Sequence, residues 1–183
     1  MEDIKERLTN YKYNFFINLQ NYLENDLIFY GSIKRYDYFD KSSDVDIAVI
    51  TDNIKSTISK LKNYLKIDKE KIKKIFQKFK KNENTIITGY KLKYEDKEKN
   101  FVFDILIYDE MYRTHVMNNI NEINNLPKYM IFILCIIKYL YYMLGLLSHN
   151  VFLETKNFIF NCYFNSTINL DKKNFMTTII LDE

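Results

Sequence analysis

Apolar residues recur at helical spacing near the start of the chain and then give way to short apolar runs. Between about Asp3 and Leu23 they fall at intervals of three and four, which predicts one amphipathic helix. The run LIFY at residues 27–30 ends at a glycine and predicts a short buried strand. After the polar stretch IKRYDYFDKSS, the β-branched run DVDIAVI at residues 44–50 predicts a second strand.

The middle of the chain is rich in lysine and is followed by two further apolar runs. Residues 53–81 predict one or two helices with one buried face. The apolar positions of that face are Ile58, Leu61, Leu65, Ile72 and Phe76. TIITGYKLKY at 85–94 and NFVFDILIY at 100–108 predict strands, and the charged turn EDKEK between them favours an antiparallel hairpin.

From about Asp109 onward the pattern is mostly helical. Pro127 marks a boundary before the apolar run YMIFILCIIKYLYYMLGLL at 129–147, and further helices are expected at 151–163 and in the C-terminal tail. This order predicts an α/β (α+β) protein, with a mixed sheet that carries helices on one side and a small helical region after it. We expect a core at residues 1–110 and a helical region at 111–183 that packs on it.

The run at 129–147 is long enough to cross a bilayer, but its composition favours a buried helix of a soluble protein. Lys138 stands in its middle, at a cost of about 2.5–3.5 kcal/mol on insertion scales, and its four tyrosines are spread along it instead of gathering at its ends. The charged N-terminus lacks the apolar stretch of a signal peptide. We therefore expect no membrane segment and an intracellular, cytoplasmic location.

Composition narrows the class of protein without deciding its function. The chain has 183 residues, of which 47% are hydrophobic and 28% charged, so it should fold and bury a core. A net charge of +3 permits nucleic-acid binding without requiring it. Cys135 and Cys162 lack metal-ligand spacing and lie in apolar stretches, which favours buried, reduced thiols. His115 and His149 are isolated, which favours surface or helix-end roles.

Three aspartates carry the candidate chemistry. Asp44 and Asp46 open the second strand two residues apart, so strand alternation places both on one face. Asp104 is the only acidic residue inside its apolar strand, where a buried carboxylate needs a cationic partner. Converging carboxylates repel unless a cation joins them, and Mg²⁺ or Mn²⁺ suits an all-oxygen site. The sequence therefore predicts a two-metal site of the kind that clamps a phosphoryl transfer.

The segment YGSIKRYDYFDKSSDVDIAVI, with Asp104 after it, resembles the hG[GS]…DhDh motif and the third aspartate of the DNA polymerase β-like nucleotidyltransferases. The resemblance covers about residues 27–108. It implies a palm-like sheet and metal-dependent transfer of a nucleoside monophosphate from an NTP to a hydroxyl, with Asp44, Asp46 and Asp104 as catalytic metal ligands. It also implies phosphate contacts from Gly31 and Ser32, and we place Ser43 among the nucleotide-binding residues.

Beyond Asp104 the layout resembles that of poly(A) polymerases and terminal uridylyltransferases. Those template-independent enzymes carry a lysine in a hydrophobic helix after the third aspartate, which implies that Lys138 contacts the triphosphate; the alternative is a core-helix lysine that extends to solvent. Their Gly-Gly-x-x-Ser stretch is absent from SHNVFLETKNFIF, so the base is not predicted. For Arg35 the sequence leaves two roles open: a contact with phosphate, or a solvated charge in the loop.

The sequence does not decide which class of molecule supplies the acceptor hydroxyl. An RNA 3′ end is preferred, because residues Lys55 to Lys81 offer a basic track for an RNA backbone, although a solvated basic face explains the same lysines. Nucleotidylation of a small molecule, such as an aminoglycoside, or of a protein side chain is the second candidate. A non-catalytic subunit that binds nucleotide, RNA or a partner is the third. A homodimer or a partner subunit would help so short a chain to hold RNA.

Overall fold

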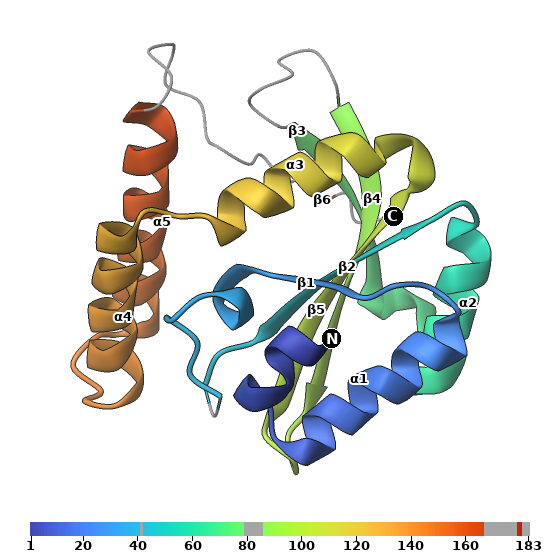
Figure 1. Cartoon of the computed structure of the whole chain (residues 1–183), viewed down its shortest axis with the longest axis horizontal. Helices are drawn as coiled ribbons and strands as arrows, with labels where there is room; N and C mark the ends of the chain where they lie inside the picture. The colour runs from blue at the N-terminus through green and yellow to red at the C-terminus, as the bar shows by residue number, and fades with distance from the viewer. Residues whose placement is uncertain (41, 79–85, 167–178, 181–183) are drawn as a thin grey trace.

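A computed structural model describes residues 1–40, 42–78, 86–166 and 179–180, and it shows a mixed sheet flanked by helices (Figure 1). The elements are η1 (Glu2–Arg7), α1 (Asn10–Leu23), β1 (Ile28–Tyr30), η2 (Gly31–Lys34), β2 (Val45–Thr51), α2 (Ile54–Leu65), η3 (Lys69–Lys71), β3 (Ile72–Lys78), β4 (Ile86–Asp96), β5 (Phe101–Asp109), η4 (Glu110–Tyr112), α3 (Arg113–Asn124), α4 (Lys128–Tyr142), α5 (His149–Ser166) and β6 (Ile179–Ile180), where η denotes a 3₁₀ helix.

The sheet has the strand order β1-β2-β5-β4-β3-β6. Strands β2 and β5 are parallel, and the other neighbouring pairs are antiparallel. The predicted hairpin is present as β4 and β5, and the predicted strands at 27–30 and 44–50 correspond to β1 and β2. The predicted α/β class, with a mixed sheet and a helical C-terminal region, is confirmed.

The larger core lies between the sheet and helices α1 and α2. Alternate residues of β2 and β5 face these helices, as strand geometry requires. Its buried members include Phe16, Leu19, Leu61, Leu65, Val45, Ile47, Val49, Phe103 and Ile105. Aromatic rings from α1 and β5 meet edge to face, as Phe16 does with Phe103 at a centroid distance of 5.4 Å. This core fixes the position of the two central strands.

Helix α3 covers part of the opposite face, so helical packing is not confined to one side as predicted. Val116 and Ile120 of α3 pack in a second cluster with Ala48, Leu106 and Tyr108. The difference follows from burial: the apolar residues on this face need cover, and α3, which follows β5 after one short 3₁₀ turn, provides it. The predicted packing of helices on one side of the sheet therefore holds for α1 and α2 only.

The N-terminal helix is interrupted, whereas a single helix was predicted from about Asp3. The chain becomes extended at Leu8 and Thr9, and α1 starts at Asn10. The Thr9 hydroxyl accepts a hydrogen bond from the Lys12 amide, which satisfies one of the free N–H groups of the first turn. A capping residue inside an otherwise periodic pattern therefore divides the element.

The lysine-rich segment at 53–81 contains one α-helix and a strand, so the prediction of helices throughout is wrong. Helix α2 ends at Leu65, the C-cap residue Lys66 adopts a left-handed conformation, and β3 begins at Ile72. Ile72 and Phe76 are four residues apart, which fits one face of a strand as well as one turn of a helix. Pairing with β4 provides hydrogen-bond partners for the backbone of β3, and this pairing selects the strand over the helix.

Two segments near the C-terminus also differ from expectation. The apolar run at 129–147 forms α4 only as far as Tyr142, and the chain then turns into α5. The tail was predicted to be helical, but its described residues, Ile179 and Ile180, form a short strand on β3; the rest of the tail lies outside the described residues. Neither cysteine is buried: Cys135 is half-buried and Cys162 is exposed, and both thiols are free.

Helices α4 and α5 lie side by side at one end of the molecule (Figure 1). They form a small cluster of their own around Leu126, Met130 and Leu134. In the described part of the chain, no single helix is long and apolar enough to cross a membrane. Two consecutive helical segments, Glu110–Asn124 and Lys128–Tyr142, have the length and apolar composition of a membrane span only when taken together, and they are bent by 72° relative to each other.

Candidate metal centre

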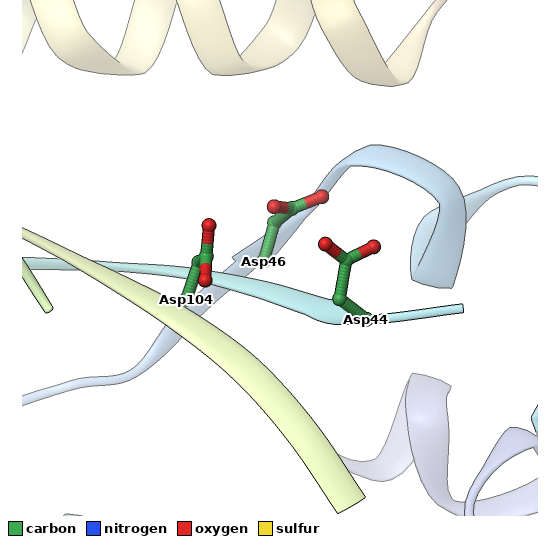
Figure 2. Close-up of side chains that lie close together, drawn as sticks. All are labelled: Asp44, Asp46 and Asp104. Carbon is green, nitrogen blue, oxygen red and sulfur yellow. The ribbon is translucent and has the colours of Figure 1, made fainter. Parts of the chain in front are cut away.

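The parallel pairing of β2 with β5 brings the three predicted aspartates together. Asp46 and Asp104 stand directly opposite each other in this register, and Asp44 precedes β2 by one residue. Figure 2 shows the three side chains projecting from the same face of the two strands. One carboxylate oxygen from each residue lies within 4.8 Å of the others. The structure therefore contains an acidic group that could hold a metal ion.

The carboxylates carry unfavourable electrostatics that a cation would relieve. Burial raises the pKa of Asp46 to about 7, and repulsion from Asp44 adds to the effect, whereas the positive charge of Lys156 on α5 opposes it. Repulsion from Asp104 is a smaller contribution in the same direction. Bringing a divalent ion to this group would offset both the burial and the repulsion.

Asp104 has one oxygen bound and one oxygen available. Its Oδ2 forms an ion pair with Lys91 Nζ at 2.6 Å. Its Oδ1 is buried and has no hydrogen-bond partner among the described residues. A buried carboxylate oxygen without a donor is costly unless a ligand satisfies it. The all-carboxylate donor set and this unsatisfied oxygen fit a hard divalent ion such as Mg²⁺ or Mn²⁺.

Gly31 is required behind Asp46. It begins η2 directly after β1, with a positive φ of 75°. A Cβ atom at this position would lie 2.7 Å from Asp46 Oδ2, closer than a Cβ atom can approach a neighbouring oxygen. Glycine therefore meets two demands at once: it adopts the left-handed conformation, and it lets the backbone approach the carboxylate.

The residues predicted to bind nucleotide lie around this turn, where several polar groups have internal partners. The Gly31 amide donates to Asn124 Oδ1 at 2.9 Å. Ser32 is buried in η2, and Ser43 Oγ accepts a hydrogen bond from the Phe39 amide at 3.2 Å. Ser43 thus closes the loop that leads into β2. Phosphate binding by these residues stays a prediction.

Lys138 is engaged in a buried ionic group that joins α4 to the loop before Asp44. Its ammonium lies 2.7 Å from the Asp37 carbonyl oxygen and 3.0 Å from Asp37 Oδ2. Arg35 binds the same carboxylate through two nitrogens and also donates to the Ile123 carbonyl, so it is buried and not a solvated charge. In this structure the Lys138 ammonium pairs with Asp37, and its predicted contact with the triphosphate stays a prediction.

The pKa values of this buried group follow from its pairing. Burial raises the pKa of Asp37, but the hydrogen bonds and charges of Arg35 and Lys138 outweigh that effect and hold it below its ordinary value. Burial lowers the pKa of Lys138, and Asp37 opposes the change. Asp37 thus acts as the common partner of two cations and orders the loop on α4.

Three lysines on the sheet lie on the same face as the carboxylates, and sequence reasoning missed their placement. Lys93 stands opposite Asp104 on β4, and Lys91 stands opposite Lys73 on β3. Strand alternation would have placed Lys91 and Lys93 away from Leu92, but the pairing register was needed to set them beside Asp104. We call Lys73, Lys91 and Lys93 the lysine strip. Lys156 gave no signal in the sequence.

Comparison of the chain with protein-family models, with curated proteins and with solved structures finds no match. The resemblance to polymerase β-like nucleotidyltransferases therefore rests on the sequence motif alone. What the structure shows is a mixed sheet with an acidic triad that could hold a metal ion.

Proposed function

We propose that the protein is a metal-dependent nucleotidyltransferase that moves a nucleoside monophosphate from an NTP to a hydroxyl acceptor. The acceptor oxygen forms a bond to the α-phosphorus, the bond to the β-phosphate oxygen breaks, and pyrophosphate leaves. The observation that carries the proposal is the in-register convergence of Asp44, Asp46 and Asp104, with one buried oxygen of Asp104 left for a ligand.

The roles of the residues follow from their positions. Asp44 and Asp46 would hold the ions, Asp104 would join them through Oδ1 and accept the proton of the attacking hydroxyl, and Gly31 would keep Asp46 in place. Divalent ions supply charge stabilisation for the phosphoryl oxygens and lower the pKa of the acceptor hydroxyl. Positioning and electrostatics would provide most of the rate.

Transfer is tested by incubating the purified protein with each labelled NTP and Mg²⁺ or Mn²⁺, with and without RNA. We expect a labelled acceptor and pyrophosphate from at least one NTP, and we expect Asp46→Asn to reduce the rate by a factor of about 10³ or more. The matched control is Asp68→Asn, an exposed carboxylate in the turn after α2, which should retain full activity. Equal rates for wild type and Asp46→Asn would overturn the proposal.

For the acceptor we propose an RNA 3′ end. The lysine strip supports this choice, because three cations beside the carboxylates would accompany a phosphate backbone as its end enters the site. Helix α2 gives no such support: its apolar residues Leu61 and Leu65 pack on the opposite face of the sheet from Asp46. Only part of the predicted basic track at 55–81 therefore lies on the face of the site.

Binding of a labelled RNA oligonucleotide at several salt concentrations tests the acceptor. Removing one phosphate contact should reduce the slope of log affinity against log salt by about 0.7. We expect this reduction for Lys73→Gln and for Lys93→Gln, and no change for Lys55→Gln and Lys66→Gln, which lie on or next to α2. Salt-insensitive RNA binding, or transfer only to a small molecule or a protein, would contradict the RNA acceptor while leaving nucleotidyl transfer intact.

A further inference from the structure

The outer face of α4 is an uninterrupted apolar stripe. Six large apolar side chains on it are exposed to solvent, and they recur at intervals of three and four residues, so they line one side of the helix. They are Tyr129, Phe132, Ile133, Ile136, Tyr139 and Met143. The exposed fractions of Phe132 and Met143 are 65% and 63%. We call these six residues the α4 stripe.

The α4 stripe carries no charge along its length. Between Tyr129 and Met143 the only ionisable cation is Lys138, which is buried against Asp37 on the other side of the helix. A helix that is apolar on all sides is normally buried. The inner side of α4 is already covered by the loop before Asp44 and by α5, so the stripe is the side still without a cover among the described residues.

The size of this apolar surface matches a protein interface. Apolar side chains are also exposed beyond the stripe, such as Leu146 in the turn after α4 and Phe158 on α5, which are 69% and 67% exposed. From the exposed fractions of its six residues, the stripe alone presents roughly 700 Å², where a typical monomer shows a largest apolar patch of about 300–600 Å² and a stable interface buries about 800 Å² per partner.

The charge pattern favours a second copy of the chain over the alternatives. A charged partner would find no complement on the stripe. Helices that lie in a lipid surface carry lysine and arginine on their polar flanks. Among the described residues of α4 and α5, Lys138 is buried, and the charge of half-buried Lys156 lowers the pKa of Asp46. Lys128 is therefore the one exposed lysine that the structure describes on these two helices, too few for such a flank. An uncharged surface is complementary to itself.

We propose that the protein forms a two-fold symmetric homodimer in which the α4 stripes of two copies pack antiparallel. A two-fold axis brings the same surface of both copies together, and it places Ile136, the middle of the stripe, next to its own equivalent. Lys128 then lies beside the last turn of the partner's α4, where the helix end carries partial negative charge. The carboxylates stay accessible, because Lys138 and Tyr142 hold the opposite side of α4 on the loop before Asp44.

Light scattering of the full chain after gel filtration tests the association. We expect twice the monomer mass of 22.3 kDa at micromolar concentration without detergent. Phe132→Lys should weaken dimerisation at least about tenfold, because it buries a charge in the apolar contact. Met111→Lys is the matched control: Met111 is 73% exposed but lies outside α4, so the variant should remain a dimer. Circular dichroism of both variants confirms that they fold.

Cysteine cross-linking tests the geometry in a background with Cys135→Ser and Cys162→Ser. Oxidation should link Ile136→Cys to its own copy and should leave Tyr129→Cys unlinked, because antiparallel packing separates the two ends of a helix about 22 Å long. Linking of Tyr129→Cys alone would overturn the antiparallel arrangement. A monomeric mass at all concentrations, or flotation of the monomer with anionic vesicles, would overturn the homodimer.

Discussion

The neutral substitution Asp46→Asn should stabilise the metal-free protein while it removes metal binding. Burial and the neighbouring carboxylates raise the pKa of Asp46 from 3.8 to about 7, so the ionised form is held in the folded protein at a cost. That difference corresponds to about 4 kcal/mol above pH 7. Because the side chain is only partly buried, solvent screening reduces the figure, and we expect a gain of about 1–3 kcal/mol.

The sign of the pH dependence follows from the raised pKa. The folded wild type binds a proton more tightly than the unfolded chain does, so its stability falls as pH rises. The stabilising contribution of protonated Asp46 is complete below pH 3.8 and is lost as pH rises through about 7. The advantage of Asp46→Asn should therefore be largest at pH 8 and should shrink toward pH 5.

Urea unfolding in EDTA at pH 8 and pH 5 measures this difference, with Asp68→Asn as a control expected to change stability by less than about 0.5 kcal/mol. Adding Mg²⁺ or Mn²⁺ should raise the stability of the wild type, by about 2.7 kcal/mol at a hundredfold excess over its dissociation constant, and should leave Asp46→Asn unchanged. A variant that is no more stable than wild type at pH 8, or an advantage that does not shrink at pH 5, would refute the reasoning.

Three further substitutions test individual contacts. Gly31→Ala should lower Mn²⁺ affinity and stability, because its Cβ would collide with Asp46 Oδ2. Gly145→Ala is the control: Gly145 also has a positive φ but has no neighbour within 4 Å, so this variant should lose only about 1–2 kcal/mol of stability through backbone strain. Equal Mn²⁺ affinities for the two variants would contradict the proposed collision. Lys91→Met should raise Mn²⁺ affinity about three- to tenfold in a titration, because it frees Asp104 Oδ2, and Lys66→Met on the other face should not. Asp37→Asn should lower the free energy of unfolding by about 3–5 kcal/mol, because it leaves Arg35 and Lys138 buried without their carboxylate. Glu110→Gln is the control: it removes a carboxylate whose partner Arg113 is exposed, so the free energy of unfolding should change little.

The aspartate group could be predicted from the sequence because its geometry depends on local rules. Alternation fixes the side chains of Asp44 and Asp46 on one face of a strand, and an acidic residue in the apolar run around Asp104 signals a partner. The placement of Lys91 depends on the register between strands, which alternation alone does not set. The pairing of Lys138 with Asp37 joins residues far apart in the chain, so no local pattern indicates it.

The errors in the fold have a common physical cause. The spacing of Ile72 and Phe76 satisfies a helix and a strand equally, and the tertiary partner β4 decides the outcome. Likewise, helix α3 was expected on the same side as the other helices, but it packs on apolar residues of the opposite face, such as Ala48 and Leu106. Local sequence specifies which residues are apolar, and long-range pairing specifies which surface buries them.

The parallel pairing of β2 with β5 has a consequence for the order in which the protein folds. The β4–β5 hairpin closes a short loop, but a parallel pair needs a long crossover, here through α2, β3 and β4. Asp46 and Asp104 therefore meet only after this slow, non-local step. Partly folded chains would have no place for a divalent ion, so an ion bound at this group would enter after the folding barrier, and it would slow unfolding and leave the folding rate unchanged.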